Sequence, residues 1–522
     1  MPLLKRLPRP VGLLAVLVLA LVLVIGCAAL PSLENREPSW ALPQDQARET
    51  RIGRSASEPL AAHPGLAGIH PLPNAREAFA TRVLMAQMAD RTLDVQYYIW
   101  RADTTGLLLL DALIQAADRG VRVRLLLDDM NTAGLDPLLR AADAHPNLDL
   151  RLFNPFVVRS ARWMGFVSDF SRLNRRMHNK SFTADNLISV VGGRNVGDEY
   201  FGATEDVLFS DLDVMVAGEV VSEVSSDFDR YWGSASSYPA ELILGAASQV
   251  DRDHLDDAIR EVRQTERARD YLRAVERSDF VREVRESDLQ LEWARTRVFS
   301  DAPGKGLGYV EEDGLLSSQL SETIGPVNRQ FNLVSPYFIP TETGVAALRR
   351  MTERGIRVRV LTNSLSATDV AIVHSGYARY REDLLEAGIE LYEMKPLPEH
   401  AEMARTIDSV GASATSLHAK TFEVDGNWVF VGSYNFDPRS NDLNTELGFL
   451  IESPNLARQL VATFDETVPK LAYRVRLDDD GDLYWTSETD DGTERWDTEP
   501  GTGWFKRFSV GFFSLLPIEG LL

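Results

Sequence analysis

The sequence contains a single cysteine, Cys27, and only eight histidines in 522 residues. One cysteine excludes an intramolecular disulfide framework, a zinc ribbon and an iron–sulfur cluster, and the few scattered histidines leave little for a metal site. Positive charge is also scarce, because 55 Lys and Arg face 77 Asp and Glu, which gives a formal net charge of −22. General nucleic-acid binding needs a positive face, so no nucleic-acid partner is expected, although a local basic cleft stays open.

The length of the chain predicts an organisation in two parts. A hydrophobic fraction of 44% is that of a folded globular protein, and 522 residues exceed what one hydrophobic core normally supports. We therefore expect two domains, or one large unit with internal pseudo-symmetry.

The N-terminus resembles a bacterial lipoprotein signal. Three basic residues precede an uncharged apolar run over residues 11–25, which ends in Gly26 and Cys27. The run is shorter than the ~20 residues that span a bilayer and suits a secretory signal. This order predicts a lipid on Cys27 and a membrane-associated protein of the bacterial cell envelope, with inner or outer membrane left open. An uncleaved signal anchor with an incidental cysteine is the alternative.

A strand–helix–strand pattern occurs twice in the sequence. In each copy a glycine closes the helix before a β-branched run, as expected for a helix C-cap. Such units predict parallel sheets with right-handed crossovers, and hence an α/β fold. The predicted elements are strands over 93–100, 121–127, 331–338 and 356–361, and helices over 106–119 and 343–354.

The repeat continues into two copies of the motif H-x-K-x-x-x-x-D, each followed by an asparagine. From histidine to asparagine the two copies keep one offset of 240 residues, which chance does not explain. Alternation along a strand places His and Lys on one face, so two such faces meeting across a pseudo-dyad would form a single site. The copies comprise His178, Lys180, Asp185 and Asn195, and His418, Lys420, Asp425 and Asn435.

Two imidazoles and two ammonium groups suit phosphodiester chemistry without a metal or another cofactor. One neutral imidazole can attack phosphorus, and the other can protonate the leaving alkoxide and then deprotonate an incoming alcohol or water. The lysines and asparagines can stabilise the charged phosphate oxygens. Each imidazole needs a partner that fixes its tautomer, and the candidates are Asp213 and Glu446. We expect Asp185 and Asp425, which precede Asn186 and Gly426, to act mainly in turns.

On these motifs the chain resembles the phospholipase D superfamily, and more specifically bacterial cardiolipin synthases of the C type. The resemblance extends from about residue 75 to residue 470. The segments that carry it are Leu93–Trp100, Val121–Asp129, Asp169–Asp185, Phe209–Val214, Leu361–Tyr377 and Leu417–Glu446.

The resemblance implies two pseudo-twofold-related phospholipase D-like halves, each a mixed, largely parallel sheet flanked by helices, with the active site between them. It also implies His178 as nucleophile and His418 as acid and base, although pseudo-symmetry allows the exchange. The lysines and asparagines would bind phosphate. The implied reaction is phosphatidyl transfer that makes cardiolipin from phosphatidylglycerol and a second phospholipid.

Other functions share the same residues. A phospholipase D that releases phosphatidic acid, or less plausibly a nuclease, would use the same site with water as acceptor. A lipid-binding scaffold without turnover is disfavoured by the two intact motifs. Phospholipids and a membrane surface are the expected partners.

The remaining segments complete the predicted organisation. An acidic loop over residues 478–482 suits a hairpin turn better than a calcium site. The aromatic tail around residues 504–517 is too short to span a bilayer and suits an interface or packing on the body. The sequence thus predicts a signal peptide (1–26), a tether (27–75), a first half (76–215), a helical linker or insertion (216–290), a second half (291–470), and a hairpin with an apolar tail (471–522).

Overall fold

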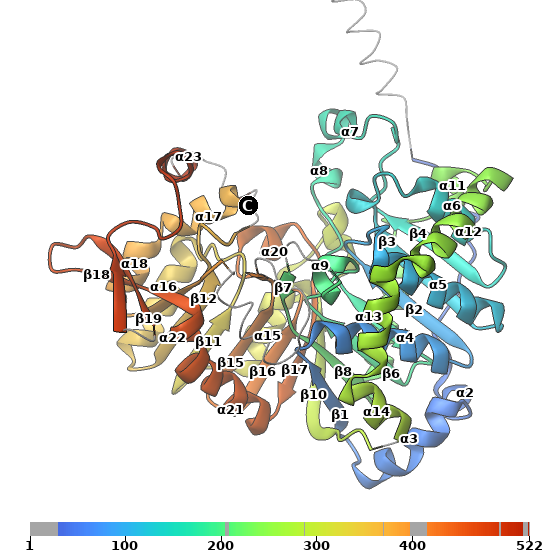
Figure 1. Cartoon of the computed structure of the whole chain (residues 1–522), viewed down its shortest axis with the longest axis horizontal. Coiled ribbons are helices and arrows are strands. Elements are labelled where there is room, and N and C mark those ends of the chain that lie inside the picture. Colours follow the sequence, from blue (N-terminus) through green and yellow to red (C-terminus); the bar gives the residue numbers. More distant parts are fainter. Residues whose placement is uncertain are drawn as a thin grey trace, which may run out of the picture.

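The computed structural model describes residues 30–203, 208–286, 288–368, 370–396, 415–489, 492–514 and 520. Two α/β halves lie side by side along the long axis of the molecule, the first in blue to green and the second in yellow to red (Figure 1). The predicted signal peptide over residues 1–26 and the predicted lipid site at Cys27 lie outside the described residues.

The first half is a mixed sheet. Its strands follow the order β9-β4-β3-β2-β5-β6-β8-β1, in which only the pairs β2–β3 and β3–β4 are parallel. The strands are β1 (Ala67–Leu72), β2 (Thr92–Tyr97), β3 (Arg122–Asp128), β4 (Leu148–Phe153), β5 (Ser181–Ala184), β6 (Ile188–Gly192), β8 (Asp213–Ala217) and β9 (Ser237–Pro239).

The second half repeats this arrangement. Its order is β10-β17-β16-β15-β11-β12-β13-β18-β19-β20, in which β11–β12 and β12–β13 are parallel. The strands are β10 (Glu292–Ser300), β11 (Gln330–Val334), β12 (Arg357–Asn363), β13 (Glu390–Met394), β15 (Lys420–Val424), β16 (Trp428–Gly432), β17 (Leu447–Glu452), β18 (Ala472–Leu477), β19 (Leu483–Thr489) and β20 (Gly492–Trp496).

Helices cover these sheets. Those of the first half are α2 (Gln44–Ala47), α3 (Arg51–Ala62), α4 (Ala75–Met88), α5 (Thr104–Asp118), α6 (Asp136–Asp143), α7 (Trp163–Ser168), α8 (Phe170–Leu173), α9 (Asp198–Phe201), α10 (Val221–Trp232), α11 (Ala240–Leu244), α12 (Gln249–Gln264), α13 (Glu266–Glu276) and α14 (Asp279–Glu286). Those of the second half are α15 (Leu316–Ile324), α16 (Thr341–Glu353), α17 (Ala371–Ala378), α18 (Arg381–Glu386), α20 (Pro438–Asp442), α21 (Pro454–Ala462), α22 (Val468–Leu471) and α23 (Trp504–Phe513).

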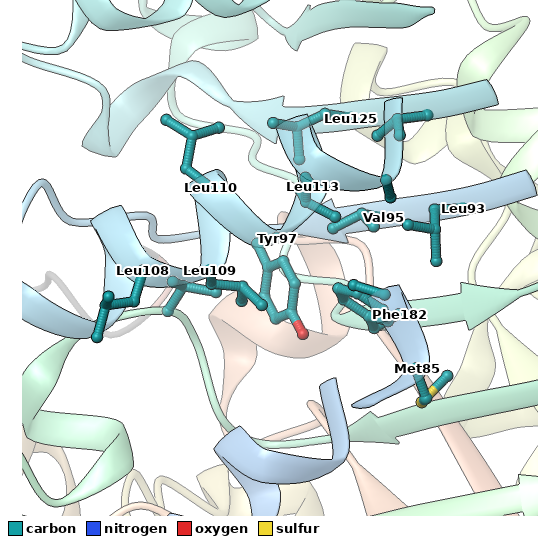
Figure 2. Close-up of a cluster of buried hydrophobic side chains, with 14 of the residues drawn as sticks. Met85, Leu93, Val95, Tyr97, Leu108, Leu109, Leu110, Leu113, Leu125 and Phe182 are labelled. Atoms are coloured by element: carbon teal, nitrogen blue, oxygen red, sulfur yellow. The ribbon is translucent and has the colours of Figure 1, made fainter. Parts of the chain in front are cut away.

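The predicted strand–helix–strand units are present in both halves, and local sequence explains their limits. The side chain of Asp103 caps α5 by accepting the N–H of Gly106. Gly120 and Gly355 follow α5 and α16 with φ angles of 91° and 81°, a left-handed conformation that glycine adopts without strain. The apolar face of α5 then packs on β2 and β3, where Leu109 and Leu113 lie over Val95 and Leu125 in the buried core (Figure 2).

The two halves form one continuous structure. Residues 292–294 of β10 pair antiparallel with β1, and residues 295–300 pair antiparallel with β17, so hydrogen bonds connect the two sheets. A separate hydrophobic core lies between the halves, where Val191 and Val214 of the first half meet Val431 and Phe449 of the second. Because these strands lead to the two histidine motifs, this junction fixes the motifs relative to each other.

Three features differ from the sequence predictions. Most strand pairs are antiparallel: within the two sheets only the βαβ units near the start of each half run parallel, so the sheets are mixed rather than largely parallel, and a separate two-stranded sheet pairs β7 (Leu208–Ser210) parallel with β14 (Thr415–Leu417). The predicted tether over 27–75 is structured from residue 30 on, since α3 and β1 belong to the fold and Arg36 Nη1 donates to the carbonyl oxygens of Ser234 and Ser237 at 2.6 and 2.7 Å.

The third difference concerns the predicted linker over 216–290. It does contain surface helices, but α10 and β9 belong to the first half, and α12 packs against α5 and α6. At the other end of the chain, β18 and β19 form an antiparallel hairpin.

Candidate active site

The two histidines occupy equivalent places, immediately before β5 and β15. Lys180 and Lys420 lie two residues further on, and each Nζ donates to the backbone oxygen of its own histidine, at 2.6 Å from His178 and 2.5 Å from His418. All four side chains are buried. The His-x-Lys spacing therefore fixes the ammonium group beside the imidazole through a local hydrogen bond.

Each imidazole is oriented by a carboxylate from the other half. His178 Nδ1 lies 2.8 Å from Oε2 of Glu446, and His418 Nδ1 lies 2.6 Å from Oδ2 of Asp211. The backbone also makes hydrogen bonds between the halves. The N–H of His178 donates to the carbonyl oxygen of Thr445 at 2.9 Å, and the N–H of His418 donates to that of Ser210 at 2.8 Å. A carboxylate at Nδ1 holds the N–H there and leaves Nε2 as the basic nitrogen of each ring.

The prediction that Asp213 orients an imidazole is wrong, and Asp211 makes this contact. Asp213 is the first residue of β8, and its Oδ2 lies 2.8 Å from Nη2 of the buried Arg82 on α4. It therefore supports the fold behind the site. The sequence does carry a signal for Asp211, since both orienting acids directly follow a hydroxyl residue, in Ser210-Asp211 and Thr445-Glu446.

The electrostatics of the site follow from burial and from two nearby ammonium groups. Burial, and then Lys180 and Lys420, lower the pKa of His178 well below its usual value, and burial and Lys420 also lower the pKa of His418. Burial and Lys420 lower the pKa of Lys180 to about 7. Lys180 also lowers the pKa of His418, so each lysine affects the histidine of the other motif, as expected of motifs that lie close together.

The two carboxylates differ in their acidity. Burial raises the pKa of Glu446 to about 7, although Lys180 and the hydroxyl of Ser433 oppose this shift. Burial also raises the pKa of Asp211, but the contact with His418 and the charge of Lys420 outweigh it and lower this pKa below its usual value. Asp211 is therefore the stronger acid of the two.

Asn195 and Asn435, one after each motif, have buried side chains. Asn195 Oδ1 accepts the N–H of Ile99 at 3.2 Å, which directs the amide N–H₂ group away from the backbone. The side-chain oxygen of Asn435 is buried without a hydrogen-bond partner in the described part of the chain. A buried polar group of this kind favours a polar ligand or an ordered water beside it.

Asp185 and Asp425, the last residues of the motifs, lie in tight turns. Both have positive φ angles, 50° and 57°. The carboxylate of Asp185 accepts the N–H groups of residues 90–92 at 2.8–2.9 Å, and that of Asp425 accepts those of residues 328–330 at 2.7–3.2 Å. They therefore join the motif hairpins to β2 and β11 and make no contact with the histidines.

Two aromatic contacts to the histidines were not predicted from the sequence. The ring of Tyr98 lies edge-on to His178, with centroids 5.1 Å apart, and the ring of Tyr200 lies edge-on to His418 at 5.3 Å. The Lys180 ammonium lies 5.6 Å from the centroid of the Tyr98 ring. Both tyrosines come from the first half, so the surroundings of the site are less symmetric than its motifs.

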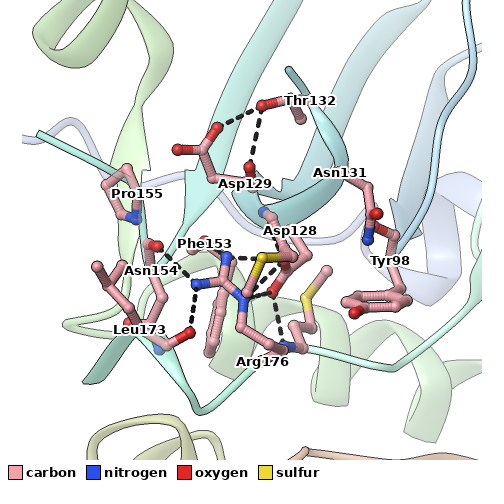
Figure 3. Close-up of polar contacts among 12 residues, drawn as sticks. Tyr98, Asp128, Asp129, Asn131, Thr132, Phe153, Asn154, Pro155, Leu173 and Arg176 are labelled. Carbon is pink, nitrogen blue, oxygen red and sulfur yellow. Dashed lines mark hydrogen bonds and ion pairs between the residues drawn. The ribbon is translucent and has the colours of Figure 1, made fainter. Parts of the chain in front are cut away.

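A buried ion pair holds the backbone just before His178. Asp128 at the end of β3 accepts the N–H of Met177 at 2.8 Å and pairs with Arg176 (Figure 3). At the end of β12, Asn363 Oδ1 accepts the N–H of Leu417 at 3.0 Å, next to His418. In both halves, a side chain at the end of a strand thus accepts the backbone N–H of the residue just before the histidine. Only at His178 does that side chain also form an ion pair.

The other predicted sites do not join this cluster. In the acidic loop, Asp478 accepts the N–H groups of Asp480 and Asp482 and closes a turn. Across the described residues, no group of three or more His, Cys, Asp and Glu side chains is arranged to hold a metal ion. Nor does any helix in that part of the chain have the length and apolar character to cross a bilayer.

Comparison with known proteins agrees with this geometry. A duplicated α/β unit with one shared two-histidine site defines a phospholipase D-like protein, and the family profile described as "Cardiolipin synthase, PLD-like domain" matches residues 84–232 and 320–468. The chain belongs to this family of phospholipase D-like cardiolipin synthases.

The chain is also similar to individual cardiolipin synthases and to one solved structure. The chain is 48% identical over 471 residues to Cardiolipin synthase C of Escherichia coli (strain K12), covering 90% of this chain and 99% of that protein. It is 27% identical over 396 residues to Major cardiolipin synthase ClsA of Bacillus subtilis (strain 168), covering 75% and 67%. The solved structure of phosphatidylserine synthase from Haemophilus influenzae Rd KW20 shares the fold, with a TM-score of 0.53 at 14% identity, over 90% of this chain and 100% of that one.

Proposed function

We propose that this protein makes cardiolipin by transferring a phosphatidyl group from one phospholipid to the hydroxyl of phosphatidylglycerol. The observation that carries the proposal is the pair of buried imidazoles, each with Nδ1 on a carboxylate and a lysine beside it. The 48% identity to a cardiolipin synthase over nearly its whole length selects this reaction among those that such a site can perform.

The reaction proceeds by two displacements at phosphorus. In the first, His178 Nε2 attacks, the bond between phosphorus and the head-group oxygen breaks, and His418 gives its proton to the leaving glycerol or ethanolamine. In the second, His418 takes the proton of the phosphatidylglycerol hydroxyl, the new oxygen–phosphorus bond forms, and the bond to His178 breaks. His418 ends the cycle protonated, as it began.

The two carboxylates favour this order of roles. A general acid must carry a proton, and the ionised Asp211 at its Nδ1 stabilises the imidazolium form of His418. The anionic phosphate offsets the charges of Lys180 and Lys420, which lower the pKa of His418 in the free site. Glu446, whose pKa is raised to about 7, orients His178 with less negative charge.

Lys180, Lys420, Asn195 and Asn435 would bind the phosphate. Two ammonium groups and two amides can stabilise the charge on its oxygens in the transition state, so no metal or other cofactor is required. Asp185 and Asp425 would support the site through their turns. Hydrolysis to phosphatidic acid is the alternative outcome, because water can take the place of the lipid hydroxyl.

The test is analysis of lipid products. The purified full chain, given phosphatidylglycerol in detergent micelles with or without phosphatidylethanolamine, is expected to yield cardiolipin by mass spectrometry. Free glycerol or ethanolamine identifies the donor. His178→Ala and His418→Ala are each expected to abolish turnover, and EDTA is expected to leave it unchanged. Phosphatidic acid as the only product would reject transfer in favour of hydrolysis.

We further propose that the protein is held at the bacterial cell envelope by a lipid on Cys27, after removal of residues 1–26. The basic start, the apolar run and the Gly26-Cys27 junction support this anchor. A substrate that resides in a bilayer requires the enzyme to work at its surface.

A further inference from the structure

Two short helices expose large apolar side chains to solvent. On α7 and α8, Trp163, Val167 and Phe170 are 68%, 78% and 49% exposed. On α23, four aromatic side chains are between 54% and 74% exposed: Trp504, Phe505, Phe508 and Phe512. These two segments hold seven of the twelve large apolar side chains that are exposed among the described residues. Exposed apolar groups concentrated in this way mark an interaction surface.

The two segments belong to different halves but lie at the same edge of the molecule. Figure 1 shows α7 and α8 of the first half and α23 of the second at its upper edge. The described chain begins at that edge too, beside α11, where Arg36 bonds to Ser234 and Ser237.

Both segments are connected to the catalytic histidines through the fold. The α7–α8 segment connects the carboxyl end of β4 to His178, which follows α8 by five residues. α23 packs on α17, which follows the carboxyl end of β12, and Asn363 at that end holds the backbone of Leu417 beside His418. Each segment is therefore connected, through one half of the fold, to the histidine of that half.

The chemistry of the segments fits a lipid bilayer. Each contains a tryptophan, a residue that favours the boundary between head groups and acyl chains. α23 carries Lys506 and Arg507, and no acid occurs between residues 504 and 514, although the whole chain has a net charge of −22. An acidic protein is repelled by anionic lipid, so a local cationic, aromatic contact is what its docking requires. The chain just before α7 is attached to the first half, since Arg159 and Arg162 bond to Asp129.

We propose that α7–α8 and α23 form a two-point docking surface that inserts shallowly into a bilayer with anionic lipid and holds the site over the head groups. The proposal rests on the proposed function, because it assumes a bilayer substrate. Two contacts, one from each half, fix the orientation of the pseudo-twofold axis to the membrane, which a single flexible anchor cannot do.

Site-specific labels test the insertion directly. Because Cys27 is the single cysteine, Val167→Cys and Phe508→Cys each introduce one further thiol for an environment-sensitive fluorophore. Gln459→Cys on the exposed face of α21, at the opposite edge in Figure 1, is the matched control, and the labelled parent gives the background from Cys27. The probes are vesicles of phosphatidylglycerol and phosphatidylethanolamine, with and without a nitroxide-labelled lipid.

We expect the fluorescence at residues 167 and 508 to rise about twofold or more on vesicles and to be quenched by the nitroxide, with no change at residue 459. The proposal is overturned if neither label, or only one, is quenched while the chain floats with the vesicles. It is also overturned if the labels become buried without lipid, which would indicate contact between two protein chains.

Kinetics separate docking from chemistry. In the combined variant Trp163→Ser, Val167→Ser, Trp504→Ser and Phe505→Ser, we expect the apparent KM for vesicles to rise about tenfold or more. Turnover of monomeric short-chain phosphatidylglycerol should change less than about twofold, because these side chains do not touch the site. Gln459→Ser should match the parent on both substrates. An unchanged KM for vesicles contradicts the docking surface. If the parent protein is inactive on both substrates, the proposed function is contradicted instead. The fluorophore experiment then still shows whether α7–α8 and α23 insert into the bilayer.

Discussion

His178 Nδ1 lies 2.8 Å from Oε2 of Glu446, a residue 268 positions further along the chain. Asp211 makes the reciprocal contact to His418 over 207 positions. Each half thus supplies one imidazole and the carboxylate that orients the other, so neither half contains a complete site. This exchange explains why the duplicated units share one active site and why the β1–β10–β17 junction matters for function.

The orienting carboxylates should be as important as the histidines for turnover. Glu446→Gln and Asp211→Asn keep the shape of each side chain but remove the charge that fixes the Nδ1–H tautomer. We expect each to lower kcat by about 10²–10⁴-fold, the contribution of a positioned acid or base, with a smaller change in KM. Steady-state cardiolipin formation measures both constants. Near-normal kcat in either variant would contradict the orienting role.

Replacing Asp213 should mainly reduce the stability of the fold, whereas replacing Asp211 should mainly reduce activity. Asp213→Asn breaks a fully buried ion pair with Arg82, which typically costs about 3–5 kcal/mol of folding free energy. We expect a marked loss of stability in urea unfolding, with residual activity in the molecules that remain folded. Asp211→Asn should unfold closer to the parent and have little activity. If instead Asp211→Asn lost stability and Asp213→Asn lost activity while remaining folded, Asp213 would be the residue that orients the imidazole.

The covalent intermediate should form on His178. After mixing with phosphatidylglycerol and rapid quenching at alkaline pH, where phosphohistidine survives, we expect a phosphatidyl adduct on the peptide that contains residue 178. His178→Ala removes the adduct, and Lys180→Met reduces it through weaker phosphate binding. An adduct on the His418 peptide instead would exchange the roles of the two histidines, and no adduct on either would reject the double displacement.

Substrate affinity should fall as the pH rises above neutrality. Because the pKa of Lys180 is lowered to about 7, its ammonium is charged below that pH and neutral above it. A neutral amine attracts the phosphate less, so KM should be constant below about pH 7 and rise above it. In the complex the bound anion raises this pKa, so kcat should stay constant to higher pH. A flat KM from pH 6 to pH 9 at fixed ionic strength would contradict this titration.

The lipid anchor should be separable from the catalytic site. Cys27→Ser removes the thiol that would carry the lipid, so we expect the protein to leave the membrane fraction in part and to lose the acyl mass. The variant should retain turnover in detergent micelles, because Cys27 is remote in sequence from every site residue. If neither the fractionation nor the mass changes, the N-terminus is not lipidated.

The sequence determined the duplicated fold and most of the site. Glycines after the helices, capping side chains and apolar strands act over a few residues, so the βαβ units of both halves could be predicted. The paired motifs placed His178, Lys180, His418 and Lys420 in one site, because their common offset indicates a pseudo-dyad.

Tertiary structure decided the contacts that cross between the halves. Asp211 and Asp213 are both acids, just before and at the start of β8, and only tertiary packing puts the first beside His418 of the other half and the second beside Arg82 of α4. The antiparallel strands, the early structure before residue 75 and the common edge of α7 and α23 also depend on long-range pairing. Local sequence limits which side chains are available, but the distances between them are fixed by burial and hydrogen bonding between segments far apart in the chain.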